Sequence, residues 1–332
     1  MKPILGILLC EAAGIGPELV AKMCAQNKFG AYCRPLLIGD VRVLKLGMKI
    51  AGVEFPFNII EDTSKIEWDG PVPIIDLKNL DAQTISIAAV NAKSGRATGE
   101  TIHAALDLCK SGIINGFVYA PLNKAALKYG GFNFESEMNL MANYLDFKGV
   151  YGEMNVVNDL WTSRATSHIP FKDISSHLTI EVLLDAIRLA QSTLKKNGYD
   201  NPRIAVAALN PHAGENGSCG TEEIDVIIPA INVAKSEGIN VIGPFPADTI
   251  FINAFKGMYD VVTTLYHDQG QIALKLMKFE EGVTVSTGLP YPITTPAHGT
   301  AFDIAGKGIA NIGPMEKAVM IASKMAEWEI ER

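Results

Sequence analysis

Three of the six histidines in the sequence occupy the same kind of position. His168, His212 and His267 each follow an expected strand and open a tight turn. In parallel α/β sheets, ligands bind outside the carboxyl ends of the strands, so these imidazoles are expected at a binding edge. Three imidazoles there could hold a divalent metal and leave positions open for a substrate. Their spacing matches no local metal motif, so the residues alone also allow three unrelated structural histidines.

A second stretch whose residues could bind a ligand or take part in chemistry spans residues 298–311 near the C-terminus. It is rich in glycine, which tolerates positive φ and lets the backbone approach a ligand closely. His298 and Asp303 add a polar ring and a carboxylate to the same stretch. By composition alone, it could also be a glycine-rich connection before the last helix.

These residues need a scaffold, and the sequence indicates an α/β one. Short apolar strands alternate with helical patterns along the whole chain, which predicts mostly parallel sheets covered by helices. A strand is expected over residues 156–168 and an amphipathic helix over residues 179–197. A long helical pattern covers residues 86–111, where Gly95 and Gly99 are expected to mark a break.

Length and composition limit the function classes. The chain has 332 residues, enough for two domains, with 48% hydrophobic residues and a net charge of −7. Charges are mixed and form no basic stripe, so no nucleic-acid partner is expected. No apolar run is long enough to span a membrane, and the apolar start over residues 1–10 is interpreted as a buried strand. Five cysteines without a Cys-x-x-Cys pair predict reduced, buried thiols in a cytoplasmic protein.

Seven short blocks then occur in order along nearly the whole chain. They lie at residues 14–18, 120–124, 210–215, 243–249, 266–270, 288–290 and 298–301. Together they resemble the 4-hydroxythreonine-4-phosphate dehydrogenase family of pyridoxal phosphate biosynthesis and its paralogues. The run from His298 to Lys307 resembles the adenine-binding loop of the wider isocitrate/isopropylmalate dehydrogenase superfamily. The first block alone fails the dinucleotide-binding pattern, because Leu19 stands where a third glycine is needed.

The resemblance assigns roles to individual residues. It implies that His168, His212 and His267 bind one divalent metal ion. Imidazole ligands suit several metals, so the ion could be Zn, Mg, Mn or Co. NAD or NADP is expected at a loop formed by the residues His298, Gly299, Thr300, Ala301 and Asp303. The expected acid/base or supporting residues are Lys124, Asp248 and Asp268.

The substrate side departs from the family pattern. Lys275 falls on a family substrate lysine, but the other four substrate positions are changed. The family's histidine, threonine, asparagine and phosphate-binding arginine fall on Glu135, Ser136, Thr284 and Ile293. Loss of the arginine removes a bidentate phosphate contact, which makes an unphosphorylated substrate an alternative. A shifted register, with Arg164 or Lys278 supplying the charge, is the other explanation.

By resemblance, the fold is expected to be the two-domain isopropylmalate-dehydrogenase-like α/β fold with its active site in the interdomain cleft. Residues 1–125 and 283–332 would form the NAD-binding domain, and residues 126–282 the domain for metal, substrate and dimerisation. The implied activity is NAD(P)- and metal-dependent oxidation of a secondary alcohol in a hydroxy acid, with decarboxylation, by a homodimer whose subunits share the metal site. Alternatives within the family are threonate-type and cis-dihydrodiol acid substrates. Alternatives from other classes are a phosphate acetyltransferase-like transferase and a silent ligand-binding paralogue.

Overall fold

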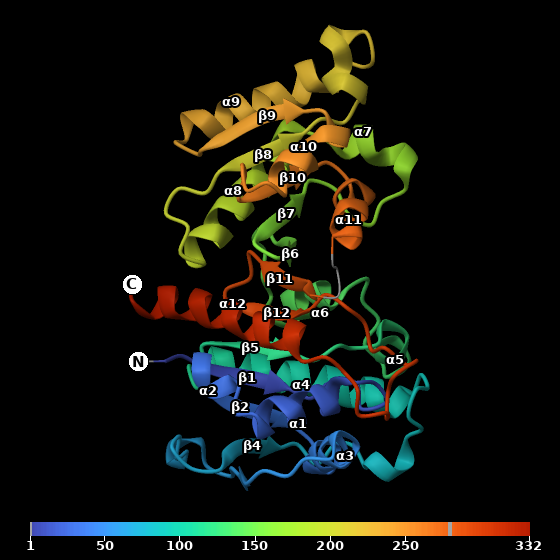
Figure 1. Ribbon diagram of the computed structural model, residues 1–332, viewed down its shortest axis with the longest axis vertical. Coiled ribbons are helices and arrows are strands. Elements are labelled where there is room, and N and C mark those ends of the chain that lie inside the picture. The colour runs from blue at the N-terminus through green and yellow to red at the C-terminus, as the bar shows by residue number, and fades with distance from the viewer. Residues whose placement is uncertain (1, 278–280) are drawn as a thin grey trace. The chain divides into compact units, whose positions relative to one another are not determined.

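The computed structural model describes residues 2–277 and 281–332 and divides the chain into two compact units (Figure 1). Unit 1 comprises Met1–Gly149 and Leu289–Arg332, and unit 2 comprises Val150–Gly288. Unit 1 is therefore made of two stretches of sequence that lie on either side of unit 2 in the chain. The chain passes from unit 1 to unit 2 after residue 149 and returns to unit 1 after residue 288. The assignment of residues 1–125 and 283–332 to cofactor binding and of residues 126–282 to metal and substrate stays a prediction.

Unit 1 contains a parallel sheet in the order β3-β4-β2-β1-β5-β12. Strand β5 is buried along its whole length and β1 in all but its first residue, as expected when helices cover both faces. The strands are β1 (Ile4–Leu8), β2 (Arg34–Gly39), β3 (Phe57–Ile59), β4 (Val72–Asp76), β5 (Gly116–Tyr119) and β12 (Ile293–Pro296).

The helices of unit 1 are α1 (Gly16–Ala25), α2 (Phe29–Tyr32), α3 (Val41–Ala51), α4 (Ala92–Lys110), α5 (Lys124–Tyr129), α6 (Glu137–Tyr144) and α12 (Gly313–Ile330), with 3-10 turns at Thr63–Lys65 and Ala82–Thr84. Helix α4 runs through Gly95 and Gly99 without a break, which corrects the sequence-based expectation. These glycines instead allow close packing. A Cβ on Gly95 would lie 1.8 Å from the Ala126 carbonyl oxygen, and one on Gly99 would lie 2.2 Å from the Phe132 ring.

Unit 2 contains a mixed sheet in the order β11-β6-β7-β10-β8-β9, in which β6 pairs antiparallel with both β11 and β7. The other pairs, β7 with β10, β10 with β8 and β8 with β9, are parallel. The strands are β6 (Gly152–Val157), β7 (Leu160–Arg164), β8 (Ile204–Ala207), β9 (Val241–Phe245), β10 (Val261–Thr264) and β11 (Val283–Thr287).

The single strand expected over residues 156–168 is wrong, because the chain reverses there between β6 and β7. Asn158 has a φ of 53° and forms the turn with Asp159. Asparagine tolerates this left-handed conformation, which two-residue hairpin turns require. Strand β7 consequently ends at Arg164, and His168 lies four residues beyond it.

The helices of unit 2 are α7 (Ile174–His177), α8 (Ile180–Lys196), α9 (Ile228–Ser236), α10 (Ala247–Ala254) and α11 (His267–Leu276), with 3-10 turns at Phe171–Asp173 and Pro211–Gly217 and a π-helical turn at Glu223–Ile227. The amphipathic helix expected over residues 179–197 is confirmed as α8. The Thr179 hydroxyl caps its start by accepting a hydrogen bond from the Val182 amide at 3.2 Å, and Gly198 follows its end with a φ of 89°.

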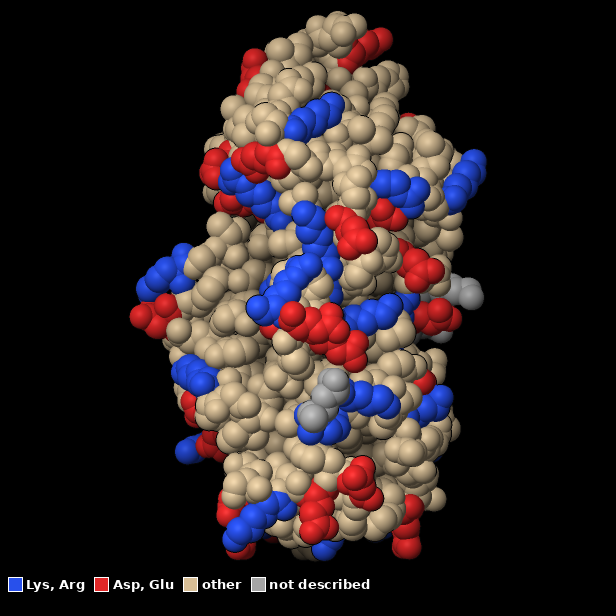
Figure 2. Space-filling model, turned by 90° about the vertical axis from the view of Figure 1, so that its left-hand side faces the viewer, with Lys and Arg blue, Asp and Glu red and all other residues tan. Residues whose placement is uncertain are grey.

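The surface carries charges of both signs. Figure 2 shows Lys and Arg side chains interspersed with Asp and Glu side chains over the face drawn there. All five cysteines are free thiols, four of them buried as expected, whereas Cys219 is exposed. Within the described ranges, no helix is both long and apolar enough to cross a membrane.

Candidate active site

Two of the three candidate histidines lie together in unit 2. His168 follows β7 and His267 begins α11 directly after β10. These strands are parallel neighbours, with Arg164 paired to Thr264 at their carboxyl ends. The chain therefore leaves both strands at the same edge of the sheet, and the centres of the two imidazole rings lie 5.5 Å apart.

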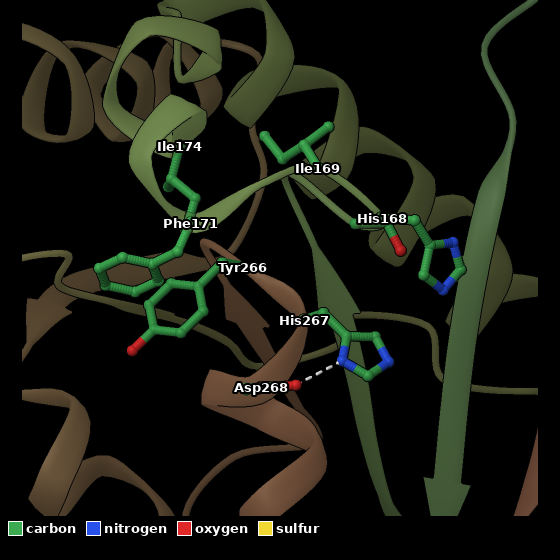
Figure 3. Close-up of a pocket in the computed structure, with 8 residues that line it drawn as sticks. His168, Ile169, Phe171, Ile174, Tyr266, His267 and Asp268 are labelled. Carbon is green, nitrogen blue, oxygen red and sulfur yellow. Dashed lines mark hydrogen bonds and ion pairs between the residues drawn. The ribbon is translucent and has the colours of Figure 1, made fainter.

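The two histidines line a pocket of about 250 Å³. Its walls are formed by Ser167, His168, Ile169, Phe171, Ile174, Tyr266, His267 and Asp268. Figure 3 shows the imidazoles on one side of the pocket and the rings of Phe171 and Tyr266 on the other. Those aromatic rings pack edge to face with their centres 5.7 Å apart. The pocket thus joins a polar wall of ring nitrogens to an apolar wall, the usual composition of a small-molecule site.

Asp268 fixes the orientation of the His267 ring. Its Oδ1 atom lies 2.7 Å from Nδ1 of His267 (Figure 3). A carboxylate oxygen can only accept, so Nδ1 carries the proton and the Nε2 lone pair is left for another partner. This carboxylate–histidine arrangement is the one that supports metal-ligating imidazoles in proteins.

His212 follows the third strand of the same parallel group, because β8 is the other neighbour of β10. It lies in the turn Pro211–Gly217, where residues 212–216 all have left-handed backbone angles, with φ between 45° and 76°. Such a conformation costs about 1–2 kcal/mol for each residue other than glycine. Sustained strain of this kind persists only where the surrounding structure enforces it, and it is concentrated at functional sites.

The His212 side chain is exposed, and it does not join the other two in a ready-made cluster. Over residues 2–277 and 281–332, no group of three or more His, Cys, Asp or Glu side chains is arranged to hold a metal ion. One chain therefore presents two adjacent imidazoles, one of them oriented by a carboxylate. Their chemistry suits a borderline divalent cation, which requires further ligands to complete its coordination.

The candidate cofactor loop of residues 298–311 lies in unit 1 against the start of α1. The Ile15 amide donates to the Thr300 carbonyl at 3.2 Å, and a Cβ on Gly14 would meet the Thr300 side chain at 2.8 Å. Ala301 has a φ of 45°, a strained value for alanine. Thr300 is buried, whereas Gly299 and Asp303 are exposed and accessible to a ligand.

An ion pair that sequence reasoning missed anchors this loop. The Lys22 ammonium donates to Glu18 at 2.7 Å and to the carbonyls of Gly308 and Ala310 at 2.9 Å each. Glu18, only 1% exposed, also accepts a hydrogen bond from the Ala310 amide at 2.7 Å. The Glu-Lys spacing of four residues on a helix was the available signal, but such pairs are usually surface features.

His298 is half-buried at the start of the loop. Burial lowers its pKa below the ordinary value, although a contact between Nδ1 and the Gly299 carbonyl at 3.0 Å opposes the shift. The imidazole is therefore neutral at physiological pH and presents one donor and one acceptor.

The remaining acid/base candidates occupy different places. Lys124 begins α5, with its side chain 56% exposed and its ammonium 3.5 Å from Glu137. The Tyr119 hydroxyl donates to the same Glu137 at 3.4 Å. Asp248 is exposed in the first turn of α10, where the helix dipole favours a carboxylate.

Two of the substrate candidates, Glu135 and Lys275, are exposed, with Lys275 two turns after His267 on α11. The Ser136 hydroxyl caps α6 by accepting from the Asn139 amide at 3.2 Å. Thr284 accepts from the Asn155 side chain at 3.0 Å. Ile293 has no exposed surface and pairs with Phe117 inside the sheet. A side chain enclosed in this way does not contact a ligand, so position 293 gives no information about substrate phosphate.

The alternative source of positive charge, Arg164, is already paired. Its Nη2 donates to Glu153 at 2.7 Å, and the two side chains are 8% and 19% exposed. Burial lowers the pKa of Arg164 while Glu153 opposes that shift. Lys278, the other alternative, lies outside the described residues.

Comparison with known proteins identifies the family. The family model described as pyridoxal phosphate biosynthetic protein PdxA matches residues 31–322. The chain belongs to the PdxA family. This membership confirms the resemblance drawn from the seven sequence blocks.

Individual members of the PdxA family are similar over almost their full length. A Rhizobium meliloti (strain 1021) protein, provisionally named 4-hydroxythreonine-4-phosphate dehydrogenase 2, is 41% identical over 98% of this chain and 94% of its own. A Clostridium botulinum protein, provisionally named D-threonate 4-phosphate dehydrogenase, is 36% identical over 97% of each chain. The crystal structure of 4-hydroxythreonine-4-phosphate dehydrogenase from Burkholderia phymatum has a TM-score of 0.82 at 37% identity, over 98% of each chain. The expected α/β class, with mostly parallel sheets flanked by helices, is confirmed.

Proposed function

We propose that this protein is an NAD(P)- and divalent-metal-dependent dehydrogenase that oxidises a secondary alcohol in a phosphorylated hydroxy acid. The observation that carries the proposal is the pair His168 and His267, 5.5 Å apart at the carboxyl ends of two parallel strands. Support comes from the relatives, which are named dehydrogenases of 4-hydroxythreonine 4-phosphate or D-threonate 4-phosphate.

His168 and His267 would hold the cation with His212, and the ligands would come from both subunits of a homodimer. A divalent cation held there would supply the positive charge that favours loss of the alcohol proton, and a bound nicotinamide would supply the hydride acceptor. Asp268 would keep the His267 proton on Nδ1, which leaves the lone pair of Nε2 for the cation. The rings of Phe171 and Tyr266 would form the apolar side of the site.

Other residues would bind the substrate and the cofactor. Lys275 would pair with an anionic group of the substrate, because it is exposed on the helix that begins with His267. Asp248 and Lys124 are the proposed proton carriers. The exposed backbone of Gly299 and the exposed carboxylate of Asp303 would contact the adenosine half of the dinucleotide. Where oxidation produces a β-keto acid, the product would then lose carbon dioxide.

A second candidate is an unphosphorylated hydroxy acid or diol acid. Glu135 favours it, because this exposed carboxylate stands where the family has a histidine and would repel a phosphate at short range. The two candidates predict that different compounds support NAD reduction: phosphorylated acids under the first and unphosphorylated acids under the second. Purified protein with Mn²⁺, Co²⁺ or Zn²⁺ is tested for NAD and NADP reduction with D-threonate, 4-hydroxythreonine and diol acids, each with and without phosphate where that ester exists.

The metal requirement has its own test. His168→Ala and His267→Ala should each abolish stoichiometric Co²⁺ uptake and NAD reduction, whereas the matched change His103→Ala should preserve both. His103 serves as the control because it stacks on Tyr144 in unit 1, with ring centres 3.8 Å apart, and has no place in the pocket. Full turnover by a metal-free double variant would refute the metal proposal.

A further inference from the structure

The strained His212 turn is held by two adjacent glutamates that the function described above does not use. Glu223 is 2% exposed, yet its carboxylate makes three hydrogen bonds with one short segment. Its Oε1 accepts from the amides of Leu209 and Asn210 at 2.9 Å and 2.8 Å, and its Oε2 accepts from the Asn210 side chain at 2.9 Å. The carboxylate thus fixes the chain where it leaves β8, two residues before His212.

The same carboxylate also leaves no room for a side chain inside the turn. Gly214 is buried in the middle of the left-handed run, and a Cβ there would lie 2.6 Å from Oε2 of Glu223. The contact is possible only because residue 214 has no side chain. Glu223 opens a π-helical turn, a rare element that is frequent at functional sites.

Glu222 connects this turn to the segment that carries His168. Its Oε2 accepts from the Asn210 side chain at 2.6 Å, and its Oε1 accepts from the Ser175 hydroxyl at 2.8 Å. Ser175 lies on α7, the short helix that follows His168 in the chain. A continuous hydrogen-bonded path therefore runs from the His168 segment through Glu222 to Asn210 and the His212 turn.

We infer that Glu222 and Glu223 are positioning residues that set the placement of His212 relative to the segment bearing His168. This inference rests on the proposed metal function, because its purpose is to present His212 as a ligand. Neither glutamate would touch the metal or the substrate. Outer groups of this kind commonly change metal affinity about 10–100-fold when they are removed.

The test compares Glu223→Gln, Glu222→Gln and Ser175→Ala with the wild type and with Glu237→Gln. Glu237 is the matched control, since it pairs with Arg188 on the surface of the same unit and has no contact with the His212 turn. Three readouts are used: hydrogen exchange of the amides at residues 209–217 without added metal, the dissociation constant for Co²⁺, and the visible spectrum of the Co²⁺-saturated protein.

Glu223→Gln should speed exchange at residues 209–217, raise the Co²⁺ dissociation constant about 10–100-fold and alter the cobalt spectrum. The more exposed Glu222→Gln and Ser175→Ala should act in the same direction with smaller effects, and Glu237→Gln should match the wild type. If Glu223→Gln does not fold, the other two variants decide the question by the same readouts.

Two results would overturn the inference. One is a Co²⁺ dissociation constant within twofold of the wild-type value, together with an unchanged cobalt spectrum, in Glu223→Gln, Glu222→Gln and Ser175→Ala. The other is faster exchange with unchanged cobalt binding, since the glutamates would then support the turn without placing His212. A wild-type protein that binds no Co²⁺ would instead refute the metal function itself, and the inference with it.

Discussion

Asp268 Oδ1 lies 2.7 Å from Nδ1 of His267, and this one contact determines which nitrogen of the ring carries the proton. The carboxylate lies in the first turn of α11, while the imidazole is the first residue of the same helix. The acceptor and the donor belong to consecutive residues, so the contact needs no distant element. A single side-chain change can separate this orienting role from the role of the ring.

Replacing Asp268 tests that separation. We expect Asp268→Ala to weaken Co²⁺ binding about 10–100-fold while leaving His267 in place. Isothermal titration of the variant with Co²⁺ measures the change, with Asp200→Ala as the control because Asp200 is an exposed aspartate elsewhere in unit 2. An unchanged dissociation constant for Asp268→Ala would mean that the ring is oriented by other contacts.

The candidate cofactor loop, which Lys22 and Glu18 anchor, gives a second prediction. Lys22→Met removes the cation that joins Glu18 to the carbonyls of Gly308 and Ala310, so the loop should loosen. The KM for NAD is expected to rise roughly tenfold, equivalent to about 1.4 kcal/mol of lost binding, with a smaller change in kcat. Steady-state kinetics measure both constants. Lys65→Met, which affects an exposed pair with Asp62, should leave them unchanged.

The contact between α4 and α5 is tested by Gly95→Ala. The new methyl group would lie 1.8 Å from the Ala126 carbonyl oxygen, so the two helices must move apart. Overpacking of this kind costs about 1–3 kcal/mol, which lowers Tm by several degrees in a chain of this size. Gly70→Ala is the matched control, because a Cβ there would approach only the tip of the Glu67 side chain, at 4.0 Å. Equal Tm values for the two variants in thermal unfolding would contradict the packing described.

The buried pair of Arg164 and Glu153 allows a fourth test. Glu153→Gln leaves the guanidinium 8% exposed and without its counter-charge, which is expected to cost about 3–5 kcal/mol. Urea unfolding measures the loss, and Glu237→Gln at the exposed Arg188 pair should show no measurable change. If Glu153→Gln were neutral in stability and bound phosphate esters more tightly, Arg164 would be the substrate cation after all.

The half-buried His298 predicts a pH dependence. Burial lowers its folded-state pKa below 6.5, so the unfolded chain takes up the proton first as the pH falls. The free energy of unfolding that His298 contributes is therefore fully present above pH 6.5 and is lost as the pH falls through the folded-state pKa.

His298→Gln removes this contribution. Because burial also lowers the pKa of His103, only the difference between variant and wild type isolates His298. Urea unfolding at about pH 7.5 and about pH 5 should show a smaller loss of stability in the variant than in the wild type. The opposite order would mean that the folded state favours the charged imidazole.

The sequence predicts those features that depend on local pattern. The alternation of strands and helices, the capped helix α8 and the position of His267 at the end of a strand all follow from residues close together in the chain. The pairing of His168 with His267 needed one more fact, that β7 and β10 are neighbours. No periodicity contains that information, because strand order is set by packing of the whole sheet.

Features that depend on tertiary contact could not be predicted in this way. From sequence alone, Gly95 suggests a break in a helix. The structure shows that it lies in close contact with the backbone of α5. Ile293 suggests a lost phosphate contact until its burial in β12 is known. The Glu18 to Lys22 pair is a common surface pattern that happens to meet a loop from the far end of the chain.

The discontinuity of unit 1 has a consequence for how the chain is completed during synthesis. Strand β12 pairs with β5, and α12 packs on both strands, yet these two elements emerge from the ribosome after every strand of unit 2. Unit 2 can therefore close while β5 still presents an unpaired edge, the kind of edge on which chains associate wrongly. A nascent chain arrested before residue 289 should depend on chaperones far more than one arrested after α12.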